Sequence, residues 1–141
     1  MNIINTLLDL NWISVLIAFL IYFFLGAMWF TLFFKKPYAR SLGKVDQLPD
    51  KPAPIFIIGP AICTLVITIA TAILIYLLDL SQAAGAISFA LLVGIGYLGA
   101  NTVNIAINPN IPNPILYGII SGAYHLTGMI LISLVIVWMK S

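Results

Sequence analysis

Four long apolar runs alternate with short polar stretches along the chain. The runs at residues 11–34, 55–78, 84–107 and 115–139 contain no Asp, Glu, Lys or Arg. An α-helix rises about 1.5 Å per residue and the hydrocarbon core of a bilayer is about 30 Å thick, so roughly 20 apolar residues suffice to cross it. The pattern therefore predicts four transmembrane helices.

The connections between the runs indicate how the helices are arranged. Residues 79–82 form so short a turn that the second and third helices must be antiparallel neighbours. In the uncharged turn 108–114, Asn113 can cap the fourth helix and Pro114 can begin it. We expect an all-α polytopic membrane protein, with four transmembrane helices in an up-down antiparallel bundle and residues 1–141 as a single transmembrane domain.

The composition agrees with this pattern. Hydrophobic residues make up 62% of the chain and charged residues 7%, whereas a soluble globular domain is about a quarter charged. So few charges cannot cover a water-facing surface. The spans and their loops use nearly all of the chain, so we expect no attached soluble domain.

The basic residues are concentrated in one loop, which predicts the orientation. Loop 35–53 contains five of the six Lys and Arg residues, so the positive-inside rule places it in the cytoplasm and both termini outside. We expect the inner (plasma) membrane of a bacterium. A single loop cluster does not indicate nucleic-acid binding. Four residues of the loop are expected to meet anionic headgroups of the lipid bilayer: Lys35, Lys36, Arg40 and Lys44.

Polar side chains from all four predicted helices fall at a similar depth. His125 is the only histidine and the only ionisable group near the midplane apart from weakly acidic tyrosines, and an intramembrane ionisable residue suggests function. It could hydrogen-bond a neighbouring helix, relay a proton or contact a ligand. A lone histidine is a poor metal or haem ligand, so we predict no metal and no cofactor. The candidate midplane polar cluster is His125, Tyr124, Tyr97, Asn101, Tyr22 and Thr68.

Two polar stripes are expected to face each other across helices three and four. In each, residues recur three or four positions apart and so share a helix face. Asn101 and Asn104 would then meet Tyr117 and Ser121 near the cytoplasmic end. The stripes would form interhelical hydrogen bonds or a small polar cavity open toward the cytoplasm. The helix-three stripe is Gly94, Tyr97, Asn101, Asn104 and Asn108; the helix-four stripe is Tyr117, Ser121, Tyr124, His125 and Gly128.

Small residues four apart allow helix backbones to approach closely. Gly118 and Gly122 form such a pair, and so do Gly96 and Ala100. These pairs could serve packing within the bundle or a homo-oligomer interface. The run Gly94–Gly99 also fits the dinucleotide-binding pattern G-x-G-x-x-G, but it lies in the middle of an apolar helix with no acidic residue after it, so we reject that interpretation.

Several short motifs stand out along the chain: Asn11-Trp12, Gly26-Ala-Met-Trp29-Phe30, Phe34-Lys-Lys-Pro-Tyr-Ala-Arg40 with Gly43, Gly122-Ala-Tyr-His-Leu126, and Trp138. With these motifs the chain resembles the bacterial membrane proteins grouped as domain of unknown function 1761. The resemblance covers essentially the whole chain and implies four helices with no established activity. The chain departs from the expected pattern in the uncharged loop 108–114, where a basic residue is expected in relatives. The resemblance draws attention to Gly26, Trp29, Tyr124 and His125.

Three classes of function remain open. The first is a small oligomeric transporter or channel-like protein built around the midplane polar cluster, with a small-molecule substrate that the sequence does not identify. The second is a structural or accessory protein that binds lipid or another membrane protein. The third is a membrane-embedded enzyme using His125. The enzyme class has the least support, because no nucleophile-and-base pair is visible, and we predict that the protein is not an enzyme.

Overall fold

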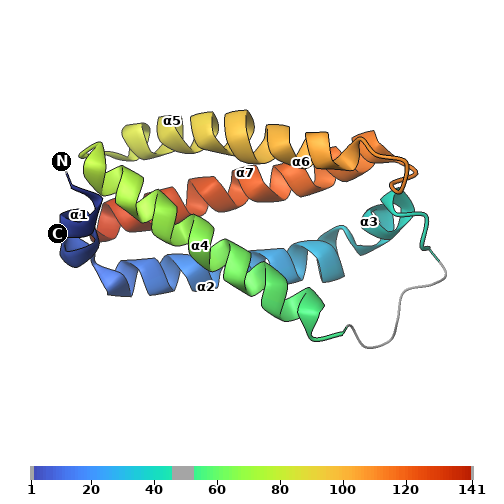
Figure 1. Cartoon of the computed structure of the whole chain (residues 1–141), viewed down its shortest axis with the longest axis horizontal. Helices are drawn as coiled ribbons and strands as arrows, with labels where there is room; N and C mark the ends of the chain where they lie inside the picture. The colour runs from blue at the N-terminus through green and yellow to red at the C-terminus, as the bar shows by residue number, and fades with distance from the viewer. Residues whose placement is uncertain (1, 46–52, 141) are drawn as a thin grey trace.

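The computed structural model describes residues 2–45 and 53–140, and within them the regular structure is entirely helical (Figure 1). Residues 46–52 of the basic loop, Lys51 among them, lie outside the described residues. The elements in chain order are α1 (Ile3–Asp9), α2 (Trp12–Met28), the π-helical η1 (Trp29–Phe33), α3 (Lys35–Ser41), α4 (Ile55–Leu77), α5 (Ala83–Val93), the π-helical η2 (Gly94–Gly99), α6 (Ala100–Ala106) and α7 (Pro114–Met139).

Four continuous helices are long and apolar enough to cross a membrane. They run over Trp12–Phe33, Ile55–Leu77, Ala83–Ala106 and Pro114–Met139, each within one residue of the predicted bounds. Successive helices run in opposite directions along the long axis (Figure 1). The predicted fold class, an all-α polytopic membrane protein with four antiparallel helices, is confirmed.

Helix α7 lies at the centre of the bundle. It contacts α2, α4 and the whole third span, while α4 crosses diagonally over α2 and α7 (Figure 1). In its most apolar stretch 44% of residues are buried, against 22–28% in the other spans, so α7 is the helix on which the others pack. The fully buried core includes Ala18 and Tyr22 of α2, Ile75 of α4, and Met129 and Ile132 of α7.

Side chains at both ends of the bundle tie the helices together. At one end, Asn11 caps α2 by accepting hydrogen bonds from the N–H groups of Ile13 and Ser14. Its side-chain amide also donates to the carbonyl of Met139 over 2.9 Å, and its backbone N–H donates to the Tyr76 hydroxyl over 3.2 Å. One residue therefore connects the start of α2 to the ends of α4 and α7.

At the opposite end, Asn113 connects α3 to the start of α7. Asn113 occupies the N-cap position of α7 and Pro114 begins the helix, as predicted, but the Asn113 side chain accepts no hydrogen bond from the first turn. Instead its amide donates to the carbonyl of Arg40 over 3.0 Å, and its backbone N–H donates to the carbonyl of Ser41 over 3.2 Å. The Asn113 side chain therefore holds α3 against the start of α7 instead of capping α7.

Candidate functional site

Tyr22 and His125 form a polar pair at the contact between α2 and α7. The Tyr22 hydroxyl oxygen lies 2.6 Å from Nδ1 of His125, which is hydrogen-bond distance. Tyr22 is fully buried and His125 is half-buried. The structure therefore gives the lone histidine a partner on a neighbouring helix, the first of the arrangements that the sequence left open.

Two glycines make room for the tyrosines at this contact. The ring of Tyr22 lies over Gly128 of α7 so closely that a Cβ at Gly128 would collide with it. Reciprocally, Tyr124 of α7 lies over Gly26 of α2, where a Cβ would stand 2.8 Å from the Tyr124 hydroxyl. Because the helices are antiparallel, the same Tyr-x-x-x-Gly spacing on each brings tyrosine opposite glycine twice.

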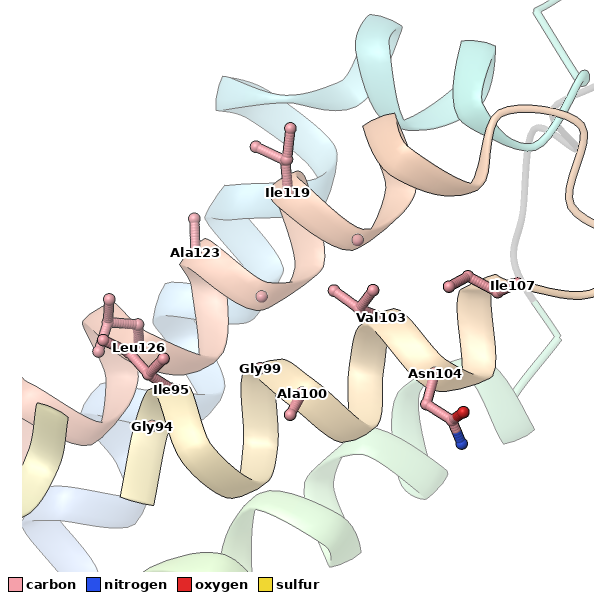
Figure 2. Close-up of a pocket in the computed structure, with 12 residues that line it drawn as sticks. Gly94, Ile95, Gly99, Ala100, Val103, Asn104, Ile107, Ile119, Ala123 and Leu126 are labelled. Atoms are coloured by element: carbon pink, nitrogen blue, oxygen red, sulfur yellow. The ribbon is translucent and has the colours of Figure 1, made fainter. Parts of the chain in front are cut away.

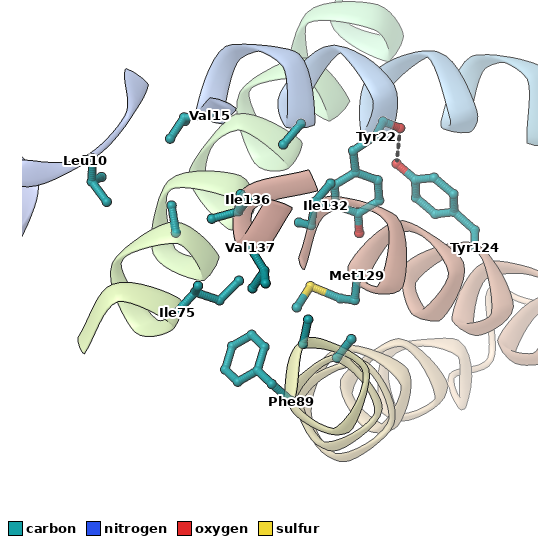
Figure 3. Close-up of a cluster of buried hydrophobic side chains, with 14 residues drawn as sticks. Leu10, Val15, Tyr22, Ile75, Phe89, Tyr124, Met129, Ile132, Ile136 and Val137 are labelled. Carbon is teal, nitrogen blue, oxygen red and sulfur yellow. Dashed lines mark hydrogen bonds between the residues drawn. The ribbon is translucent and has the colours of Figure 1, made fainter. Parts of the chain in front are cut away.

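The two tyrosines also contact each other within the buried core (Figure 3). Their ring centroids are 5.2 Å apart, and the Tyr124 hydroxyl donates a long hydrogen bond of 3.5 Å to the backbone carbonyl of Tyr22. Tyr124 packs at 4.8 Å from the ring of His125. These three side chains of the predicted midplane cluster are therefore brought together.

An aromatic column continues from this pair toward α3. Phe30 packs at 5.2 Å from Tyr124 and at 4.7 Å from Tyr38. Trp29 donates its indole N–H to the carbonyl of Ile120 over 3.1 Å, which fastens η1 to α7. All four residues suggested by the resemblance, Gly26, Trp29, Tyr124 and His125, thus lie in or beside this contact.

Tyr38 is the member of the column that lies outside the spans, on α3. Its ring packs at 5.8 Å from that of Tyr117. Burial, together with the neighbouring Tyr117 phenol, raises the pKa of Tyr38 to about 12. Tyr38 therefore stays neutral at physiological pH and closes the α3 end of the column as an uncharged side chain.

Thr68 and Ser121 do not join the Tyr22–His125 pair. Thr68 is buried, but its hydroxyl donates to the carbonyl of Thr64, one turn back in its own helix. The Ser121 hydroxyl is buried and has no hydrogen-bond partner among the described residues. Both are placed in the interior, where neither makes the interhelical hydrogen bond that the polar layer suggested.

The polar side chains of the third span at Tyr97, Asn101 and Asn104 face away from α7, so the predicted meeting of the two polar stripes is wrong. Tyr97 is 70% exposed, and Asn101 and Asn104 are exposed. Their side-chain polar atoms make no hydrogen bond within the part of the chain that the structure describes. We call this surface the outer face; it consists of Gly96, Tyr97, Ala100, Asn101 and Asn104.

The π-helical turn η2 explains why the residue spacing in the third span predicts the wrong face for Tyr97 and Asn101. Gly94 packs against Leu126 and Met129 of α7. In a regular α-helix this face would continue near Leu98 and Asn101, but a π turn contains one extra residue. The packed face therefore continues through Gly99 and Val103, and Asn101 is rotated outward.

Small residues allow α6 and α7 to approach closely, and they leave an open groove of about 720 Å³ beside the contact (Figure 2). A Cβ at Gly118 would stand 3.0 Å from Val103, and one at Gly122 would stand 3.9 Å from the Cα of Gly99. The Gly118–Gly122 pair therefore packs inside the chain. Apart from Asn104, which points away from α7, the groove is lined by apolar residues (Figure 2).

Charged groups lie at the two ends of the molecule. Lys35, Lys36, Arg40 and Lys44 all lie at the α3 end of the molecule, and all four are exposed. At the other end, Lys140 donates to Asp79 over 2.7 Å, and this ion pair lowers the pKa of the Asp79 carboxyl. Within residues 2–45 and 53–140, no group of three or more His, Cys, Asp or Glu side chains could hold a metal ion.

The fold defines the class: an α-helical membrane protein with four membrane-span-like helices. The family described as "Protein of unknown function (DUF1761)" matches residues 13–137, and the chain belongs to it. No curated protein matches the chain, and no solved structure matches it.

Proposed function

We propose that this protein is a structural or accessory membrane protein that binds another membrane-embedded helix through its outer face. The observation that carries the proposal is the exposure of Tyr97 and Asn101 on an apolar span. Counted from Ala106 at the end of the third span, Asn101 lies about 8 Å and Tyr97 about 14 Å along the helix, at about 1.5 Å per residue.

Unpartnered amides are costly at such a depth. Transfer of an amide out of water without a compensating hydrogen bond costs several kcal/mol, of the order of 2–7. Lys and Arg can extend a long side chain toward the headgroups, but Asn101 is too short to do so. Amide side chains within membranes instead bond across helices. A neighbouring helix on the outer face would supply that bond.

The interior gives less support to transport. A transport cavity would need Tyr97 and Asn101 to gather with Tyr124 and His125, yet the first two point outward and the last two pack against α2. The groove between α6 and α7 is apolar apart from Asn104. A flux assay separates the two functions. We expect proteoliposomes of wild type and of His125→Ala to show the same proton permeability as protein-free liposomes. A proton flux that His125→Ala abolishes contradicts the proposal.

Photo-crosslinking in intact membranes tests the docking itself. A photoreactive phenylalanine derivative at Tyr97 is expected to form an adduct with a membrane protein. The same group at Val66, which is 60% exposed on α4, is the matched control and is expected to form none. Asn101→Leu should reduce the Tyr97 adduct. Equal adducts from both positions, or none from either, would contradict lateral binding through the outer face.

A further inference from the structure

We infer that the helix bound at the outer face is the same η2–α6 segment of a second copy of this chain, so that the protein forms a two-fold symmetric dimer. This inference rests on the function proposed above and names its partner. It is carried by three features of the outer face: its hydrogen-bonding chemistry, its small residues, and its separation from the surfaces already used inside the chain.

The hydrogen-bonding chemistry is self-complementary. Copies of one sequence have the same distribution of basic residues and therefore insert in the same orientation. The two-fold axis then runs along the membrane normal, and the two η2–α6 segments lie parallel, with identical residues at identical depth. Asn101 would meet Asn101 of the second copy. Because a carboxamide both donates and accepts, each can satisfy the other, and a single Asn in a helix pair also fixes its register.

The backbone at the outer face is open to close approach. A Cβ at Gly96 would meet no atom within 4 Å, and Ala100 is exposed one turn further on. Gly96, Ala100 and Asn104 are all exposed, and Ala100 and Asn104, one α-helical turn apart, share a helix face. Small residues at this spacing let two parallel backbones come near enough for short amide side chains to bond.

The other small-residue pair is occupied within the chain. Gly118 packs against Val103 and Gly122 against Gly99, so this G-x-x-x-G serves the α6–α7 contact. Gly96 and Ala100 are exposed on the third span. The sequence allowed each small-residue pair to serve either packing within the bundle or an oligomer interface. Gly118 and Gly122 pack inside the chain, and Gly96 and Ala100 are available to a second copy.

Disulfide crosslinking in membranes tests the dimer. The native Cys63 is exposed on α4, a helix that is not part of the proposed interface, and serves as the control. We expect oxidation with copper phenanthroline to link Ala100→Cys, made in a Cys63→Ser background, into a dimer of two differently tagged copies. The unmodified chain, with Cys63 alone, should form no disulfide-linked dimer. A disulfide needs Cα atoms about 4.4–6.8 Å apart, so the reaction reports close approach.

A second substitution tests the amide pair. Asn101→Leu in the Ala100→Cys chain should lower the crosslinked fraction about threefold at limiting protein density, as expected for the loss of an average interhelical polar contact. Asn101→Gln, which keeps the amide, should lower it less. Unchanged circular dichroism and elution in detergent will show that both variants fold; a reduction explained by misfolding of Asn101→Leu leaves the comparison of Ala100→Cys with Cys63 to decide.

The remaining outcomes separate this inference from the proposed function. Crosslinking of Ala100→Cys to a different membrane protein, without dimer, overturns the second copy but supports lateral docking. A dimer through Cys63 and not through Ala100→Cys overturns the interface. The absence of any adduct from both Ala100→Cys and the photoreactive group at Tyr97 overturns the dimer and the proposed function together.

Discussion

The α2–α7 contact and the outer face contain similar side chains in opposite environments. The contact buries Tyr22 beside Gly128 and gives it a hydrogen-bond partner, His125. The outer face leaves Tyr97 exposed beside Gly96, with open space above the glycine. The fate of a polar group in an apolar helix thus depends on what lies opposite it, a property of two helices together that neither sequence segment contains alone.

The largest change in stability is expected from a substitution that adds a side chain at the glycine of the α2–α7 contact. Gly128→Ala places a methyl group against the ring of Tyr22, which cannot move aside because it is fully buried and bonded to His125. Overpacking costs about 1–3 kcal/mol, which outweighs the gain of about 0.5–1 kcal/mol that Ala brings to a helix in place of Gly. We expect a lower free energy of unfolding, measured by SDS titration in mixed micelles.

Gly96→Ala is the matched control on the outer face. The same methyl group enters open space there, so the free energy of unfolding of the monomer should not fall, and it should rise by up to about 1 kcal/mol because Ala favours a helix over Gly. If both variants are equally destabilised, the distinction between the packed contact and the outer face does not hold.

Hydropathy was sufficient to predict the helices but not their rotation. The four spans could be placed within one residue because each apolar run is bounded by polar residues or prolines. Which side of a span faces its neighbours follows from residue spacing only where the helix is regular. The π turn at Gly94–Gly99 adds a residue, so Tyr97 and Asn101 lie on the opposite side of the span from the one that regular α-helical spacing predicts. No charge or proline in the sequence marks that turn.

The Tyr22–His125 contact was partly predictable. Counting depth along the spans put Tyr22, Tyr124 and His125 in one layer, and the structure brings these three together. The same count included Thr68, whose hydroxyl bonds its own helix instead. The sequence contains a stronger indication of this contact: Tyr-x-x-x-Gly occurs at 22–26 and again at 124–128. In antiparallel helices this repeat matches each tyrosine with a glycine.

A double-mutant cycle at Tyr22 and His125 measures how much their contact contributes to the free energy of unfolding, and we expect a smaller value than the effect of Gly128→Ala. Tyr22→Phe leaves Nδ1 of His125 without its partner, and a lost partner of this kind costs about 1–3 kcal/mol. His125→Phe should cost a similar amount, and the double variant should cost less than the sum. We expect a coupling free energy of about 0.6 kcal/mol, and no more than about 1.7, from the range for polar contacts between membrane helices. Additive effects would show that the pair contributes no interaction to the contact.

The smallest effect on monomer stability is expected from the most polar part of the outer face. Asn101→Leu and Asn104→Leu remove amides that make no hydrogen bond within the described residues, and both side chains are exposed. Under detergent conditions chosen to keep the chain monomeric, the double variant should unfold within about 0.5 kcal/mol of wild type. Leu is also a better helix former than Asn, so any shift should be toward greater stability. A loss as large as that of Gly128→Ala would mean that the two amides hold the chain's own fold together, and the outer face would then have to be described as part of the bundle. An unchanged monomer that no longer dimerises would locate the role of the amides between chains.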